Sequence, residues 1–260
     1  MWAALCQQMT STIRENKALK AGAVVFWIVI WEIASLLIGE ELFLPSPLSV
    51  LKRLVTILPE PDFWSSIFFT LRCILLGYIL SVVSASVSAF LSYRFALVSI
   101  ILDPLVRIVR ATPVASIVIL VLVWVRSRYL SVVISFMMVF PIIYTNLLEG
   151  LMAVDKNLLE AADVYRIKTA KRLRYIFIPS LSPYIQSAIR TSLGLCWKSG
   201  IAAEVIGLPD GSIGERVYEA KIYLSTPDLF AWTVVIIILA FLFEKFFIYL
   251  SDAAMRRLER

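Results

Sequence analysis

NLLEAADVYRIKTAKRLRYIFIP, residues 157–179, is the longest strongly basic interruption in an otherwise apolar chain. Four cations fall close together within it: Lys168, Lys171, Arg172 and Arg174. Its first four residues have the pattern of a capping box, in which Asn157 caps a helix and Glu160 reaches back to the cap. We therefore expect a short pair of helices outside the membrane, ended by Pro179 and Pro183, that docks another protein.

The remainder of the 260 residues has the composition of a membrane protein. Hydrophobic residues make up 60% of the chain and the mean hydropathy is +0.85, whereas soluble domains have about 45–50% apolar residues. Long apolar runs predict an all-α, polytopic integral membrane protein with six transmembrane helices. These runs are 22–39, 68–93, a third that includes 113–125, 129–148, 183–206 and 229–250. Residues 94–112 are expected to form a basic turn and 207–228 a loop.

The distribution of basic residues predicts the orientation in the membrane. Fifteen Lys and Arg lie in segments 1–20, 94–112, 149–182 and 251–260, against six in the other loops. Because cytosolic loops carry the excess of Lys and Arg, both termini are expected in the cytosol. The expected domains are a cytosolic lead 1–21, one transmembrane domain 22–250 with a cytosolic loop 155–179, and a cytosolic tail 251–260. The net charge of +6 is explained by these loops, so no nucleic-acid partner is expected.

Several function classes are disfavoured by residues that the sequence lacks. It has no histidine, and its three cysteines have no metal-like spacing, so neither a metal site nor a disulfide framework is expected. It has no G-x-x-x-x-G-K-[ST] phosphate loop, so the chain itself is not expected to bind ATP or another cofactor. No pair of carboxylates lies at helical spacing within one span, which argues against a membrane-embedded enzyme.

Four ionisable residues inside the expected spans are candidates for a solute pathway: Glu32, Arg190, Lys198 and Glu204. A charge at the centre of a membrane helix costs about 2.5–3.5 kcal/mol, so such residues usually have a function. On a helix, Arg190, Lys198 and Glu204 return to nearly the same face, where the cations would favour an anionic solute. The alternative is that these side chains pair within the helix bundle or reach the membrane surface.

Small residues mark the second span as a site of close helix packing. Gly77, Ser81, Ala85 and Ala89 recur at three- or four-residue spacing. In lipid, small side chains at that spacing let helices approach one another closely.

The basic stretch resembles the EAA loop of ABC importer permeases. Glu160-Ala161-Ala162 and Ile176-Phe177-Ile178-Pro179 keep the spacing of that motif, with Arg166 in place of its glycine and Ile178 in place of its leucine. In that family the glycine makes a sharp turn between two short helices, and a turn of that shape is less expected with Arg166 in its place. Further stretches are similar to the nitrate/sulfonate/taurine-type branch: 44–47, 70–72 with Gly77, 113–124, 203–204 and 211–214.

This resemblance implies a type I ABC importer permease fold in the inner or plasma membrane. It implies as partners cytosolic ABC ATPases that use the ATP, an extracytoplasmic substrate-binding protein, a second permease copy in a homodimer, and membrane lipid. The implied ATPase-coupling residues are Asn157, Glu160, Ala161, Ala162, Tyr165, Arg166 and Pro179. Two alternatives stay open: Glu160 caps its own helix in place of, or in addition to, contacting the ATPase, and the chain is a secondary transporter driven by an ion gradient.

Overall fold

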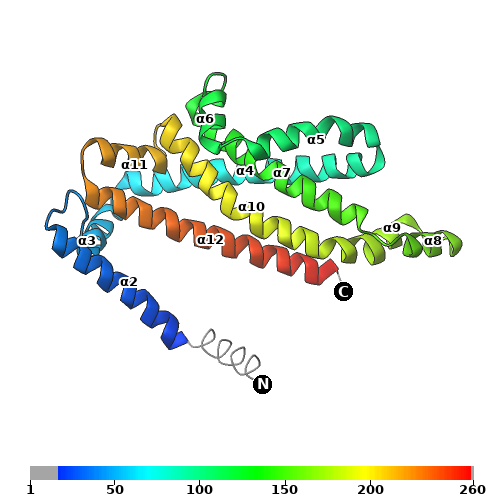
Figure 1. The fold of residues 1–260 in the computed structure, drawn as a ribbon, viewed down its shortest axis with the longest axis horizontal. Helices are drawn as coiled ribbons and strands as arrows, with labels where there is room; N and C mark the ends of the chain where they lie inside the picture. The colour runs from blue at the N-terminus through cyan, green and yellow to red at the C-terminus, as the bar shows by residue number, and fades with distance from the viewer. Residues whose placement is uncertain (1–16, 259–260) are drawn as a thin grey trace.

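The computed structural model describes residues 17–258, and every regular element in that range is helical (Figure 1). The all-α expectation is thus confirmed for this part of the chain. Most of the expected cytosolic lead, residues 1–16, and the last two residues of the expected tail lie outside the described residues. The elements are α2 Lys17–Ile38, α3 Pro47–Ile57, α4 Pro61–Arg94, α5 Ala96–Ala111, α6 Val114–Leu122, α7 Ser127–Met152, α8 Lys156–Val164, α9 Thr169–Arg172, η1 Leu173–Phe177, α10 Ile178–Gly207, α11 Ile213–Ile222 and α12 Thr226–Leu258.

Several helices are long and apolar enough to cross a bilayer. In residues 17–258 these are α4, α7 and most of α12, and the bent pair α5–α6 makes a fourth if it counts as one span. The apolar part of α2, Gly22–Ile38, is shorter. The 30-residue helix α10 carries the charged positions predicted above and is not among the spans identified in this way. A multi-pass membrane protein is therefore supported, while the number of six spans stays a prediction.

Residues 94–112 form a helix, so the expected basic turn is wrong. Helix α5 covers Ala96–Ala111. The apolar residues between the charged residues of this segment recur at helical spacing, which was the available signal. The helix stops at Thr112, which is extended with φ −85° and ψ 132°, because Pro113 disfavours helical geometry in the residue before it. Helix α6 then leaves at an angle of 108° to α5.

The centre of the bundle is the close packing of α4, α7 and α10. A Cβ atom on Gly77 of α4 would lie 2.5 Å from the carbonyl oxygen of Val132 on α7. A Cβ on Gly200 of α10 would lie 2.7 Å from a side-chain carbon of Ile74. The close approach predicted from the small residues of α4 is therefore confirmed. Two cysteines, Cys73 and Cys196, are buried in this packing as free thiols.

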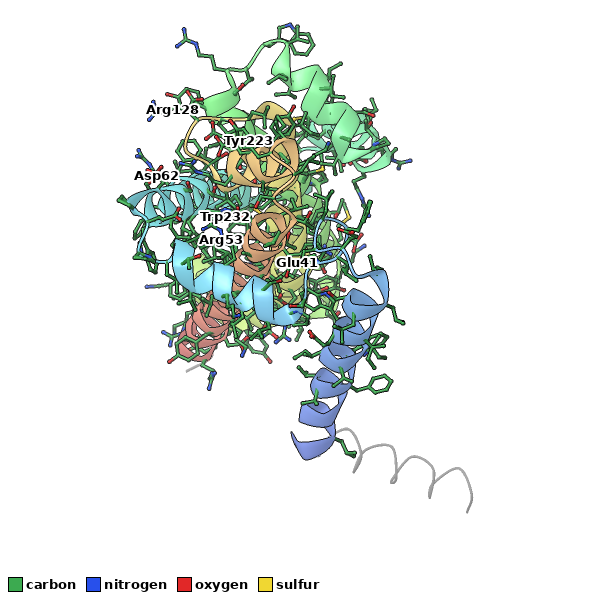
Figure 2. The ribbon with its side chains drawn as sticks, turned by 90° about the vertical axis from the view of Figure 1, so that its left-hand side faces the viewer. Glu41, Arg53, Asp62, Arg128, Tyr223 and Trp232 are labelled. Carbon is green, nitrogen blue, oxygen red and sulfur yellow. The ribbon has the colours of Figure 1, made fainter. Side chains whose placement is uncertain are left out.

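An ionic cluster joins four helices at the end of the bundle where α3 and α11 lie (Figure 2). Arg53 of α3 pairs with Asp228 at the start of α12. Arg216 of α11 pairs with Asp62 of α4 at 2.9 Å and with Glu219 of its own helix at 3.1 Å. The cluster fixes the short amphipathic helices α3 and α11 to the ends of the long ones.

The expected loop at 207–228 contains helix α11, and that expectation is therefore wrong. Ser212 is the N-cap of this helix, and its hydroxyl accepts a hydrogen bond from the N–H of Glu215 at 3.0 Å. The signal was present in the sequence, because Ser212 to Glu215 has the Ser-x-x-Glu spacing of a capping box. Polar composition concealed a helix of only ten residues.

Candidate functional site

The stretch that opened the sequence analysis folds as two short helices, α8 and α9, that project from one end of the bundle (Figure 1). The expected helix pair is thus confirmed, but its expected cap is wrong. The N-cap of α8 is Asp155, whose carboxylate accepts a 2.8 Å hydrogen bond from the N–H of Asn157. Asn157 is already inside the helix, and Glu160 has no capping hydrogen bond to a backbone N–H within residues 17–258. The aspartate two residues earlier competes successfully for the cap position.

The turn between α8 and α9 is made by Arg166 in a left-handed conformation, with φ 50°. Its N–H bonds to the carbonyl of Asp163 at 3.0 Å, and the N–H of Ile167 bonds to that of Ala162 at 2.9 Å. These two bonds are the Schellman pattern that usually has glycine at the left-handed position. The sharp turn therefore forms although the glycine of the EAA pattern is absent.

Arg172 of α9 fixes the angle between the two helices. Its guanidinium donates to the carbonyl of Ile167 at 2.8 Å and to that of Ala162 at 3.0 Å, and it also pairs with the carboxylate of Asp163. One side chain thereby binds three acceptors at the end of α8 and in the turn. In the sequence, Arg172 is distinguished from the other basic residues of this stretch by no pattern that predicts this role.

The residues at the end of α8 divide into an exposed surface and a buried contact. Tyr165 and Val164 are each 79% exposed, and Glu160 and Ala161 are also exposed. Ala162 is only 1% exposed, so it packs against its own chain. Val164 was missed by the sequence analysis, although an apolar residue next to Tyr165 in a water-facing segment was the available signal.

The prolines after this segment do not end it. Pro179 lies in the first turn of α10 and Pro183 lies inside that helix, which continues from α9 through the π-helical turn η1. A proline in the first turn needs no N–H for the helix to form. The expectation that Pro179 and Pro183 terminate the helix is therefore wrong, and α9 is connected rigidly to the long helix α10.

Arg190 and Lys198 lie together on one exposed face of α10, with Gly194 between them. A Cβ atom on Gly194 would have no neighbour within 4 Å, so the backbone between the two cations is open. Glu32 is half-buried on α2, a helix that packs against α3 and, through Trp31, against Phe230 of α12. The structure thus groups two of the four candidate pathway residues.

Glu204 is enclosed where α10, α4 and α11 meet, and it is 0% exposed. Its carboxylate accepts a hydrogen bond from the hydroxyl of Thr70 at 2.7 Å and one from the N–H of Gly214 at 3.4 Å. The same Thr70 hydroxyl accepts the N–H of Ile213 at 3.1 Å. Glu204 therefore links three helices and is separated from the exposed face of Arg190 and Lys198.

A family model matches most of the chain. Residues 74–260 match the model for binding-protein-dependent transport system inner membrane components. That range includes the helices α8 and α9 and the exposed face of α10.

Individual proteins with permease names are similar over most of their own lengths. A probable ABC transporter permease protein of Brucella melitensis is 30% identical over 216 residues, 83% of this chain and 86% of that protein. The taurine transport system permease protein of Escherichia coli is 28% identical over 226 residues, 85% and 82% of the two chains. The bicarbonate transport system permease protein of Synechococcus elongatus is 24% identical over 253 residues, 92% and 90% of the two.

Proposed function

Because the chain belongs to the family of binding-protein-dependent transport system inner membrane components, we propose that α8 and α9 dock a cytosolic ATPase. The chain is a membrane permease subunit of an ABC importer and not an enzyme in its own right. The observation that carries the docking proposal is the pair Val164 and Tyr165. These large side chains are 79% exposed at a helix end that projects from the bundle. Exposed aromatic and apolar residues of this kind are typical anchors of protein interfaces.

Within this proposal the coupling residues have different roles. Glu160, Ala161 and Tyr165 contact the ATPase directly, Arg166 and Ala162 set the shape of the turn, and Asn157 belongs to the first turn of α8. Pro179 lies where η1 joins α10, so a movement of α8 and α9 is transmitted to the face of Arg190 and Lys198. A ligand or ATPase shifts such a bundle only by binding its states unequally.

We further propose that the exposed face of α10 lines the solute path against a second copy of the chain. Arg190 and Lys198 are exposed on a helix of the bundle, and charged side chains avoid lipid tails. A path with these two cations suits a small anionic solute delivered by an external binding protein. Glu32 remains a candidate on α2, and Glu204 acts by holding α10 to α11.

The position of the proposed docking helices supports one orientation in the membrane. Helices α8 and α9 lie at the end of the bundle where α12 ends, and α3 and α11 lie at the opposite end (Figure 1). If the ATPase binds α8 and α9, the end of α12 is cytosolic and the α3–α11 end faces outward in the cell membrane. The excess of basic residues in the segments around α8 and α9 supports this direction.

Co-purification from mild detergent tests the docking proposal. Tyr165→Ala is expected to reduce recovery of an ATPase with the tagged chain by roughly 30-fold, since buried aromatic anchors often contribute about 2 kcal/mol. Tyr223→Ala is the matched control, because Tyr223 is also 79% exposed and is also the C-cap of a short helix, at the other end of the bundle. Equal recovery with both variants, or no ATPase with the native chain, would contradict the proposal.

A further inference from the structure

A basic hollow of about 610 Å³ lies beside the turn between α8 and α9. Its lining combines four cations with four aromatic or aliphatic residues: Tyr165, Arg166, Ile167, Lys168, Lys171, Arg172, Tyr175 and Ile176. The hollow adjoins the proposed docking surface of Glu160, Ala161 and Val164, and the two share Tyr165.

Two of its cations occupy positions where the backbone favours other residues. Arg166 is left-handed at φ 50°, a conformation that glycine adopts without strain. Lys168 is the N-cap of α9 and makes no side-chain cap hydrogen bond, although Ser, Thr, Asp and Asn are the stabilising residues at that position. Residues that contradict local preference are expected at functional sites. The positive charge at these two positions is therefore a candidate for a role beyond the local backbone.

The charges of the hollow are not neutralised by the chain itself. Within residues 17–258, Arg172 pairs with Asp163, but Arg166, Lys168 and Lys171 have no ion pair with Asp or Glu. All three of these side chains are exposed. Three like charges around one hollow give it a positive potential that attracts anions, and an anion with several oxygen atoms can contact all three. A phosphate group has the charge and the acceptors to do so.

The lining also changes character along its length. Lys168, Lys171, Tyr175 and Ile176 follow one face of α9 and η1, and η1 leads directly into the long helix α10. On this face the cations thus lie farther from α10, and an aromatic and an aliphatic side chain lie nearer to it. A phospholipid has the same polarity, with its phosphate outside its glycerol and acyl groups, and tyrosine is enriched at that level of a membrane.

We propose that this hollow binds the headgroup of an anionic phospholipid, with its phosphate between Arg166, Lys168 and Lys171. Tyr175 and Ile176 contact the glycerol end of the same lipid. A bound lipid would then stiffen the turn next to the docking surface, so the membrane's anionic lipid content would affect coupling. The inference rests on the proposed function only for that last consequence, because lipid binding itself needs neither an ATPase nor a solute.

The test is binding of phosphatidylglycerol or phosphatidylcholine to the purified full-length chain in detergent, followed by native mass spectrometry. The native chain is expected to bind phosphatidylglycerol in preference. The double variant Arg166→Gly with Lys168→Ser is expected to bind it roughly 30-fold more weakly, and Lys171→Gln roughly fivefold, given the attraction per basic residue at an anionic surface. Gly and Ser suit the backbone at these positions, so the double variant is expected to melt at or above the native temperature.

The controls separate the lipid from other anions. Arg126→Ser with Arg128→Ser removes two exposed cations from the α6–α7 connection and is expected to leave phosphatidylglycerol binding unchanged. Displacement of the lipid by millimolar inorganic phosphate would assign the hollow to a free phosphate group and overturn the proposal. So would unchanged lipid binding in the hollow variants, or a loss in those variants of ATPase recovery alone.

Discussion

Arg166 and Leu224 end two helices with the same backbone geometry. Their φ angles are 50° and 53°, and each follows an exposed tyrosine that is the C-cap of a short helix. The residue after each bonds back across the turn, Ile167 to Ala162 and Ser225 to Ala220, both at 2.9 Å. Both turns therefore use a bulky residue where glycine has no steric penalty.

Replacing either residue by glycine is expected to stabilise the protein. The left-handed conformation costs a residue with a Cβ about 1 kcal/mol, so Arg166→Gly and Leu224→Gly should each raise the melting temperature in detergent by about 2–4 °C. Gly211→Ala is the reverse control, because Gly211 has φ 76° and its replacement should lower the melting temperature. A fall for both glycine variants would show that the large side chains make stabilising contacts.

The N-cap of α8 is Asp155 in the structure, whereas the sequence pattern predicted Asn157, and two substitutions distinguish these assignments. Asp155→Ala removes the acceptor of the Asn157 N–H and is expected to destabilise α8 by about 1 kcal/mol. Asn157→Ala is expected to change it little, since Asn157 is inside the helix. Hydrogen exchange of the first amides of α8 measures both effects. Faster exchange in the Asn157 variant than in the Asp155 variant would restore the capping box predicted from the sequence.

Arg172 is expected to be irreplaceable by lysine. Its planar guanidinium reaches two carbonyls and a carboxylate at once, which a single ammonium group does not reproduce. Arg172→Lys should therefore speed hydrogen exchange in α8 and the following turn. Arg174→Lys is the control, because Arg174 is exposed and its recorded contact is with the ring of Tyr175, 5.8 Å away. Equal exchange in both variants would show that Arg172 does not hold the turn.

Replacement by alanine should lower the stability of the protein at Gly214 of α11 and raise it at Gly194 of α10. A Cβ on Gly214 would lie 2.3 Å from Cβ of Glu204 and 2.6 Å from the backbone N of Val205. Gly214→Ala is therefore expected to separate α11 from α10 and to lower stability by about 3 kcal/mol. Gly194→Ala meets no atom within 4 Å and should raise helix stability by up to about 1 kcal/mol. Thermal unfolding of the two variants in the same detergent measures the contrast.

Gly194→Ala also tests the proposed solute path. The added methyl group would occupy the open space beside the backbone between Arg190 and Lys198 and so narrow the path there. Slower transport by this variant, despite its unchanged or higher melting temperature, is the expected result. Unchanged transport would place the path elsewhere.

The buried Glu204 is expected to tolerate glutamine better than alanine. Glu204→Gln keeps an oxygen that accepts the Thr70 hydroxyl and the Gly214 N–H, so a loss of about 1 kcal/mol is expected. Glu204→Ala leaves the Thr70 hydroxyl without its acceptor and opens a cavity, with an expected loss of about 3 kcal/mol. Melting temperatures of both variants and of Thr70→Val test this order. A loss for glutamine as large as that for alanine would show that the negative charge, and not the hydrogen-bonding oxygen, stabilises α11.

The features predicted correctly from the sequence were those marked by a repeated or concentrated kind of residue. The all-α class followed from apolar runs, the close packing at Gly77 from small residues, and the short helix pair from the capping pattern and basic composition of residues 157–179. Helix α5 was missed because its arginines suggested a turn, and α11 because its polar composition suggested a loop. Local polarity is ambiguous in both cases, since an amphipathic helix at a membrane surface has the same residues as a connecting segment.

The contacts within the candidate site could not be predicted from the sequence. Asn157, with Glu160 three residues later, matched the capping box better than Asp155 did, yet the structure places Asp155 at the cap. Glu204 shares a helical repeat with Arg190, but burial also depends on α4 and α11, which come from distant parts of the sequence. The roles of Arg172 and of the basic hollow likewise depend on a turn geometry that Arg166 was not expected to adopt.

The two buried cysteines have a practical consequence for mapping the proposed path. Cys73 and Cys196 are enclosed where α4, α7 and α10 pack, so a water-soluble maleimide should label neither in the folded protein. With Cys6 replaced by serine, the chain would be a silent background for site-directed labelling. Single cysteines at Ser187, Thr191 and Lys198, which are exposed along α10, would then report directly which positions water reaches, and whether ATP addition changes that access.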